Sequence, residues 1–497
     1  WFARLPSPFS SKPFFLDANT AALCTPPLHS EKPGSLSLDG FERIARIALD
    51  YLQRGAIAEA QQLYSDLIQI SPFDPDVNLY LGAIAVLQSR WLDARVLLET
   101  SLQRRVDCPD AWTLLGSSLL QLGLVTDAQS CHLEALRLAP EMPEPHRGLA
   151  DVYRAMGQLD AAIGCYEQAL CLRTDFPQAS WNLATTRLLA GDYSGGWGLY
   201  HTRFSGAVGV APLLQPSLPQ WSGQPLETGQ RLLLVAEQGL GDTLQFARYV
   251  LFLVSIGVQA KLVPQPPLLA LFGDSGFPVV GVDSAVEEVE DGRGLWAPLL
   301  SVPGFLGVTP ASPLVTHPYL EVDSQRFRDW QCVLRGDDAF TVALHWQGNP
   351  LVEVGNLKGR SLPLDVFAPL ASCENVRFVS LQKGFGSEQL AYCSFADHFA
   401  DCQSMIDQVW DFRDIAAILV NCDLVITSDS GLAHLAGALG LPVWLLLHRI
   451  PDWRWGMDGE TTFWYPSMRL FRQQVAGDWA ELMQRVLAAL QDVLALR

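Results

Sequence analysis

The 497-residue sequence predicts an array of paired helices followed by two α/β domains with parallel sheets. In the first half, small residues recur with a period of 34, which is the length of a helical-hairpin repeat. In the second half, two stretches read as strand, glycine-containing turn, helix and strand, the pattern of a parallel βαβ unit. A chain of this length exceeds one ordinary domain, and these patterns divide it into about three.

The bulk composition excludes several classes of protein. A formal net charge of -19 argues against a general nucleic-acid binder and against a protein that binds anionic membranes. No run of about 18 apolar residues occurs, so we expect no transmembrane segment. The 10 cysteines form no CxxC pair and no Cys/His zinc spacing. We therefore expect no metal site and buried free thiols in a reducing cytoplasm.

The repeat array is expected over residues 41–205, after a poorly ordered lead-in at residues 1–40 that is rich in Pro and Ser. Two series of small residues and one series of glycines keep the 34-residue step, with Ser89 as an exception in the glycine series. The members are Ala48, Gly82, Gly116, Ala150 and Ala184; Ala60, Ala94, Ala128 and Ala162; and Gly55, Gly123, Gly157 and Gly191. Small residues let paired helices approach closely, and glycines turn the chain between them.

One unit of this array resembles the tetratricopeptide repeat at seven positions. They are Trp112, Leu115, Gly116, Gly123, Ala128, Ala135 and Pro140. Such arrays form curved surfaces that usually bind protein or peptide segments, so we expect a protein partner on this surface. The alternative is a purely architectural spacer or a dimerisation arm.

The first α/β domain is predicted at residues 206–335, after a Gly-, Pro- and Ser-rich connection. A buried strand at 231–236 leads into a turn that contains the loop glycines Gly239 and Gly241 and the acid Asp242. A helix is expected from about Thr243 to Ser255, and a second strand at 259–263. Asp242 at this place either caps the helix or has a chemical role.

The second α/β domain is predicted at residues 336–497. Strands are expected from Phe340 and at 376–381, 423–427 and 443–447, and helices at 364–371, 414–420 and 479–496. Two successive Rossmann-like halves suggest a cleft between them, with the strand ends of both halves facing it.

The turn Ser428-Asp429-Ser430-Gly431 lies where a strand ends and a helix begins. Free amides and the helix dipole at such a start favour phosphate, so this turn is a candidate site for a diphosphate. Ser430 either caps the helix or binds a phosphate oxygen, and Asp429 either holds a sugar hydroxyl or braces the turn. His434 either donates to a phosphate or is a satisfied structural histidine.

Several blocks in fixed order resemble the bacterial tetratricopeptide-repeat glycosyltransferases, whose catalytic half is similar to the lipopolysaccharide heptosyltransferases of the two-Rossmann glycosyltransferase-B fold. They are EQGLGDTLQFARY (237–249), WQGN (346–349), RSLPL (360–364), SLQKG (380–384), SDSGLAHLAGALGLPVW (428–444) and PDWRW…WYPSMRLFRQ (451–473). The resemblance implies metal-independent transfer of a sugar, with inversion, from a nucleotide-diphosphate-sugar donor to a protein or glycan acceptor. It implies no cofactor beyond this co-substrate.

The same resemblance assigns candidate roles to individual residues. Asp242 matches the acid proposed as general base. The donor-binding candidates are Asn349, Lys358, Arg360, Gln382, Lys383, Asp429, Ser430, Gly431, His434 and Trp453. The alternatives are solvated loop charges for Lys358, Arg360 and Lys383, and inter-domain core for Trp453.

Three places depart from the family pattern, namely His345, Ile415 and the pair His448-Arg449. They fit an alternative function, that of a non-catalytic repeat scaffold with a degenerate transferase half. A further alternative, which does not rest on these departures, is another two-Rossmann nucleotide-sugar enzyme such as an epimerase.

Overall fold

The computed structural model describes residues 38–206, 208–227, 229–237, 239–285, 293–334, 338–353 and 359–497. The lead-in expected at 1–40 therefore lies almost wholly outside the described residues. The chain folds as two compact units. The first ends at Thr186 and also takes in Thr202–Gly209, and the second comprises Arg187–His201 and Val210–Arg497. No helix in the described ranges is both long and apolar enough to cross a membrane.

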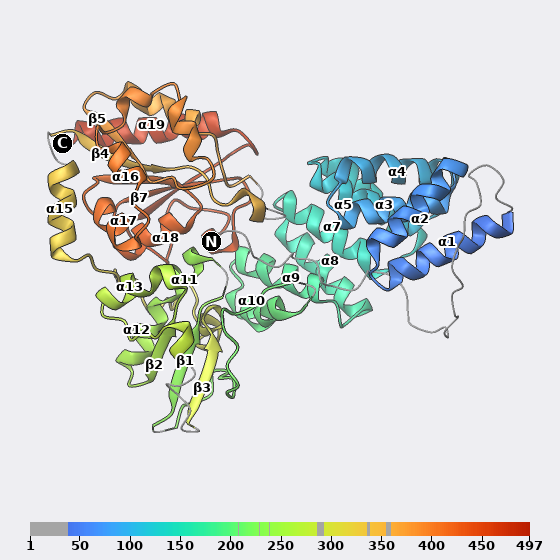
Figure 1. Ribbon diagram of the computed structural model, residues 1–497, viewed down its shortest axis with the longest axis horizontal. Helices are drawn as coiled ribbons and strands as arrows, with labels where there is room; N and C mark the ends of the chain where they lie inside the picture. The colour runs from blue at the N-terminus through green and yellow to red at the C-terminus, as the bar shows by residue number, and fades with distance from the viewer. Residues whose placement is uncertain are drawn as a thin grey trace. The chain divides into compact units, whose positions relative to one another are not determined.

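The first unit is built from helical hairpins, in which each helix from α1 to α8 lies beside its sequence neighbour (Figure 1). The helices are α1 (Leu38–Gln53), α2 (Ile57–Ile70), α3 (Pro75–Leu87), α4 (Trp91–Arg104), α5 (Pro109–Gln121), α6 (Val125–Leu138), α7 (Pro143–Ala155), α8 (Leu159–Leu172) and α9 (Pro177–Leu189). Proline begins α3, α5, α7 and α9, a position where its missing N–H costs nothing and its fixed φ fits the helix.

The small residues of the repeat allow the close helix packing that the sequence predicts. A Cβ added to Gly82 would lie 2.7 Å from Cγ of Leu98, and one added to Gly116 would lie 2.8 Å from Nε2 of His132. The turn glycines have left-handed backbone, with φ of 78° at Gly55 and 81° at Gly123. Ser89 adopts the same conformation, with φ of 57°, so the exception in the sequence is no exception in the backbone. These features confirm the predicted helical repeat array.

The second unit takes in the last residues of α9, continues with α10 (Tyr193–Leu199) and contains two parallel sheets. The smaller sheet has the order β2-β1-β3, formed by β1 (Arg231–Val235), β2 (Gln259–Val263) and β3 (Gly294–Pro298). Its helices are α11 (Leu240–Phe246), α12 (Arg248–Ser255), α13 (Pro266–Asp274) and α14 (Val302–Phe305), and α15 (Ser324–Leu334) follows them.

The larger sheet has the order β5-β4-β6-β7-β8 and all its pairs are parallel. Its strands are β4 (Phe340–His345), β5 (Val376–Ser380), β6 (Leu424–Ser428), β7 (Val443–Leu447) and β8 (Met468–Arg472). The α-helices that belong with it are α16 (Gln403–Asp407), α17 (Phe412–Leu419), α18 (Gly431–Ala438) and α19 (Trp479–Ala495), and a 3₁₀ helix spans Leu364–Ser372.

Strand order determines where these sheets leave room for a ligand. In the smaller sheet β1 lies between β2 and β3, the next two described strands in the chain, so the strand order reverses at β1. In the larger sheet the strand order reverses between β4 and β6. Open parallel sheets bind ligands at the carboxyl ends of the strands where the order reverses. The site is therefore expected where β1, β4 and β6 end.

The parallel sheets confirm the α/β prediction for the second half, and β2 and β7 have the predicted bounds. The helix expected from Thr243 to Ser255 is instead two helices, because α11 begins at Leu240 and α12 at Arg248. The division at residue 335 into two Rossmann-like domains stays a prediction.

Candidate active site

Two helix starts from the two sheets lie against each other. Helix α11 follows β1, helix α18 follows β6, and the two helices pack closely. A Cβ added to Gly241 would lie 3.0 Å from Cα of Gly431 and 3.0 Å from Cδ2 of His434. Glycine is therefore required at 241 by the approach of another backbone. This approach brings the GLGD turn and the DSG turn together.

Asp242 lies in the first turn of α11, at the meeting point of these turns. Its Oδ2 accepts a hydrogen bond from the backbone N–H of Gly239 at 3.1 Å, and its Oδ1 accepts one from Nη2 of Arg454 at 2.5 Å. The side chain keeps 21% of its surface exposed. The helix begins at Leu240 and not at Thr243, and Asp242 caps its start from within the first turn, because its carboxylate accepts from the N–H of Gly239. The capping alternative is therefore confirmed, and it leaves the chemical role a prediction.

Arg454 belongs to the PDWRW block of the family resemblance and is the residue that binds the second carboxylate oxygen of Asp242. Its Nε donates to Oε1 of Gln245 at 2.7 Å, and its Nη1 donates to Oδ1 of Asp452 at 2.8 Å. Burial opposes the guanidinium charge, but the carboxylates of Asp452 and Asp242 outweigh it and raise the pKa of Arg454. No periodic pattern links Arg454 to a partner 212 residues away.

Asp429 follows β6 directly and is buried. Burial, and then the nearby charge of Asp452, raise the pKa of its carboxyl to about 6. Arg360 and Arg454 oppose this shift. The indole N–H of Trp455 also favours the charged carboxylate, although its geometry falls short of a full hydrogen bond. Asp429 is therefore a carboxyl group whose charge changes near neutral pH.

Ser430 precedes α18, but in the described part of the chain its hydroxyl caps no amide of the helix. The capping alternative for Ser430 is therefore wrong. Its Oγ instead lies 3.2 Å from Nδ1 of His345 and 3.2 Å from Oγ1 of Thr427. The register pairs His345 with Thr427 across β4 and β6, which places the imidazole beside the turn. Burial, and then the charge of Arg360, lower the pKa of His345 to about 4, so the ring is neutral.

His434 lies in the first turn of α18, against the start of α11. Its Nδ1 lies 3.0 Å from the hydroxyl of Tyr465, and its ring stacks on Trp455 with centroids 5.5 Å apart. Burial, and then the charges of Arg454 and Arg248, lower its pKa well below the ordinary value. A neutral imidazole fixed by a stack and a hydrogen bond fits the structural interpretation and leaves the phosphate role a prediction.

Arg360 and Asn349 lie in the loop after β4. The guanidinium of Arg360 approaches Glu353, with 3.4 Å between Nε and Oε1, and a Cβ added to Gly348 would lie 3.1 Å from its Nη2. Asn349 accepts a hydrogen bond from the N–H of Leu351 at 3.0 Å and so caps a 3₁₀ turn. Lys358, the third candidate in this loop, lies outside the described residues.

Gln382 and Lys383, the candidates after β5, make bonds to backbone. Gln382 is buried; its Oε1 accepts from the N–H of Trp346 and of Gln347, and its Nε2 donates to the carbonyls of Gln347 and Phe385. Lys383 donates to the carbonyl of Ile406 at 2.6 Å, and burial lowers its pKa. These contacts hold the loops that follow β4 and β5.

Trp453 lies in a cluster of aromatic rings, as the core alternative expects. It is 3% exposed. Trp197 and Tyr200 meet it edge to face, at 5.4 Å and 5.8 Å between centroids, and Phe246 stacks on it at 6.5 Å. The guanidinium of Arg454 lies 4.6 Å from its ring centre. Trp453 therefore supports the residue that follows it.

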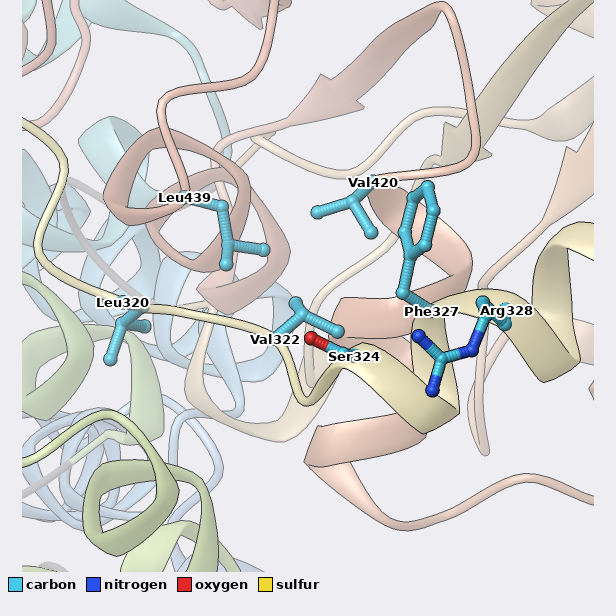
Figure 2. Close-up of a pocket in the computed structure, with 7 residues that line it drawn as sticks. All are labelled: Leu320, Val322, Ser324, Phe327, Arg328, Val420 and Leu439. Carbon is cyan, nitrogen blue, oxygen red and sulfur yellow. The ribbon is translucent and has the colours of Figure 1, made fainter.

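A hollow of about 360 Å³ lies apart from these residues, at α15 and the ends of α17 and α18 (Figure 2). Its lining is apolar except for Ser324 and Arg328, and none of the candidate residues takes part in it. In the described ranges, no group of three or more His, Cys, Asp or Glu side chains is placed to hold a metal ion.

Family models match segments in both halves of the chain. Residues 51–118 match the tetratricopeptide repeat family, residues 150–191 match a TPR repeat model, and residues 409–446 match glycosyltransferase family 9 (heptosyltransferase). The last match contains β6, α18 and the start of β7, and therefore Asp429, Ser430, Gly431 and His434.

Among curated proteins, the chain is similar to Protein FlbA of Caulobacter vibrioides, with 28% identity over 438 residues, covering 82% of this chain and 71% of FlbA. Among solved structures, it is similar to the thermophilic TPR protein TTC0263 of Thermus thermophilus, with 21% identity and a TM-score of 0.31, covering 34% of this chain and 91% of that one. It is also similar to pilF of Pseudomonas aeruginosa, with 20% identity and a TM-score of 0.30, covering 33% of this chain and 76% of that one.

The resemblance expected from the motifs is thus confirmed. The chain combines tetratricopeptide repeats with an α/β half that carries the signature of glycosyltransferase family 9, the heptosyltransferase family.

Proposed function

We propose that this protein is a glycosyltransferase that moves a sugar from a nucleotide-diphosphate-sugar donor to a hydroxyl of a protein or glycan acceptor. The observation that carries the proposal is the contact of Gly241 with Gly431, because it joins the turn bearing Asp242 to the helix start of the family 9 segment. An acid and an anion-binding helix start are thus adjacent. In the transfer of a sugar from a diphosphate to a hydroxyl, the acid takes the hydroxyl proton and the helix start binds the diphosphate.

In the proposed reaction, Asp242 acts as general base. Its carboxylate takes the proton of the acceptor hydroxyl while the hydroxyl oxygen forms a bond to the anomeric carbon of the donor sugar. The bond from that carbon to the diphosphate breaks, and the nucleoside diphosphate leaves with the electron pair. Attack from the face opposite the leaving group inverts the anomeric centre.

The leaving diphosphate gains negative charge, and in this proposal the amides at the start of α18 and the guanidinium of Arg360 stabilise it. The positive charge of Arg360 acts to lower the pKa of both His345 and Asp429, so it influences groups at the ends of β4 and β6. Asp429 is the candidate to bind a sugar hydroxyl. The co-substrate is the only small molecule this mechanism requires.

The repeat array gives the acceptor a place to bind. Helical repeats of this kind present extended surfaces to protein segments, so a macromolecular acceptor fits the chain better than a free sugar does. The acceptor, the donor base and the sugar are separate questions that the reaction assay must answer.

The proposal is tested by incubating the protein with UDP-, GDP-, ADP- and dTDP-sugars and following release of the nucleoside diphosphate, with water in place of the acceptor hydroxyl as the nucleophile. One donor should be consumed by the wild type, and Asp242→Asn should lower that rate by about 10²-fold or more. Asp323→Asn is the matched control, because Asp323 also accepts from amides at a helix start, those of Gln325 and Arg326.

Three outcomes contradict the proposal. Failure to bind any nucleoside diphosphate would favour the scaffold alternative. Conversion of a donor to an epimer without an acceptor would favour the epimerase. Full activity in Asp242→Asn, with the donor consumed normally, would remove Asp242 from its role as base.

A further inference from the structure

We propose that Arg454 is a positioning residue for the transfer reaction, which holds the carboxylate of Asp242 in one orientation across the junction of the two sheets. The inference rests on the proposed function, since it assigns Arg454 a role through the proposed base. It concerns a residue of the PDWRW block, which follows residues 409–446 that match glycosyltransferase family 9.

The first support is the geometry of the guanidinium. Arg454 lies after β7, whereas Asp242 and Gln245 both lie on α11 of the other sheet. Its three nitrogens bond to three different side chains at 2.5, 2.7 and 2.8 Å, those of Asp242, Gln245 and Asp452. A planar guanidinium with fixed donors sets the position of each acceptor, as a lysine ammonium does not.

The second support is that Arg454 itself is fixed. Its guanidinium lies over the rings of Trp453, at 4.6 Å, and Phe246, at 5.4 Å. The indole N–H of Trp464 donates to its carbonyl at 2.9 Å, and Arg472 donates to the carbonyl of the next residue, Trp455, at 2.6 Å. The side chain is therefore held by two rings, and the backbone is held at two successive carbonyls.

The third support is the distribution of bonds on Asp242. One carboxylate oxygen binds the amide of Gly239, which belongs to its own turn, and the other binds Arg454. Without Arg454 the carboxylate keeps one anchor and is free to rotate about χ2. A displacement of about 1 Å in a reacting group costs up to about 100-fold in rate, even when substrate still binds.

The test uses the full chain and compares Arg454→Met and Arg454→Lys with Asp242→Asn and the double variant Asp242→Asn/Arg454→Met. Arg326→Met is the matched control, because Arg326 also pairs with an aspartate at 2.5 Å, Asp414, but between α15 and α17. Measurements are the thermal midpoint, the affinity for UDP, GDP, ADP and dTDP, and kcat and KM for the sugar donor that the wild type consumes.

The expected result is that Arg454→Met lowers kcat by about 100-fold while KM for the donor and the diphosphate affinity change by less than about threefold. Arg454→Lys should recover less than about a tenth of the lost rate. The double variant should be no slower than Asp242→Asn alone, because a positioning residue has no effect once its base is gone.

Two results overturn the inference alone. One is a kcat for Arg454→Met no lower than that for Arg326→Met, and the other is a double variant slower than Asp242→Asn by the full Arg454→Met factor. A wild type that binds a diphosphate but consumes no donor also overturns it, while the nucleotide site stands. A wild type that binds none of the four diphosphates overturns the proposed function itself.

Discussion

Gly241 and Gly431 lie back to back, so that a methyl group on Gly241 would reach within 3.0 Å of Cα of Gly431. The two glycines lie in the first turns of α11 and α18, which follow strands of different sheets, and neither has a left-handed backbone that would itself demand glycine. Space alone therefore requires glycine at 241. The relationship is the structural basis of the candidate site.

We expect Gly241→Ala to push the two helix starts apart and to weaken nucleoside diphosphate binding by about tenfold or more, because backbone at 3.0 Å cannot yield as a side chain does. Calorimetry with the diphosphate that binds the wild type measures this effect. Gly164→Ala is the control, since nothing lies within 4 Å of its added Cβ in α8. That variant should bind normally and gain about 0.5–1 kcal/mol of stability. Equal affinity in both variants would contradict the requirement for close approach.

His132 provides a test in the repeat array. It is fully buried in α6, and among the described residues neither ring nitrogen has a hydrogen-bond partner. Leu98 lies one repeat earlier and contacts Gly82 as His132 contacts Gly116. We expect His132→Leu to raise the free energy of unfolding by about 1–3 kcal/mol at pH 7.5, because it removes unsatisfied polar atoms from the core. Urea denaturation measures the change, and a loss of stability would contradict it.

The same histidine predicts an acid sensitivity. Burial, and then the charge of Arg147, lower its pKa to about 3 in the fold, below the ordinary value of 6.5. The unfolded chain therefore binds the proton more tightly, and stability falls as pH drops from about 6.5 toward 3. His132→Leu should flatten this part of the pH profile. Parallel profiles for the two proteins between pH 7 and pH 5 would show that His132 is not the group responsible.

Asp429 predicts the opposite dependence. Its pKa is raised to about 6, above the ordinary value of 3.8, so the buried charge costs stability increasingly as pH rises from 3.8 through 6. The full shift corresponds to about 3 kcal/mol as an upper bound. Asp429→Asn should therefore raise the thermal midpoint at pH 7.5 while weakening donor binding. A variant that is both less stable and fully active would show that Asp429 braces the turn.

The local patterns in the sequence predict structure well where a few neighbouring residues determine it. The apolar run at Val443–Leu447 is a buried central strand, and its bounds follow from the sequence. Strands β3 and β8 were not predicted: β3 ends in a proline, and β8 carries Arg469 and Arg472. Charged residues and proline are typical of edge strands, so their sequences resemble loops.

In the candidate site too, local patterns predict some features, whereas others depend on contacts between distant residues. The turns around Asp242 and Gly431 follow from strand, glycine and helix patterns, which are local. Lys383 looks like a cation for a phosphate, but it donates to the carbonyl of Ile406, which a separate helix supplies. The pairing of Asp242 with Arg454 joins two sheets. Contacts of this kind depend on the tertiary packing and leave no periodic signal in the chain.

The most direct test of the account is a calorimetric titration of UDP, GDP, ADP and dTDP into the wild type and Gly431→Ala. A Cβ at 431 would meet its nearest atom, the backbone nitrogen of Gly241, at 3.5 Å, so the fold tolerates it, yet the methyl lies at the helix start where the diphosphate is proposed to bind. We predict that one diphosphate binds the wild type and binds Gly431→Ala about tenfold or more weakly. Equal affinity in the two proteins, or no binding to the wild type, would contradict the site.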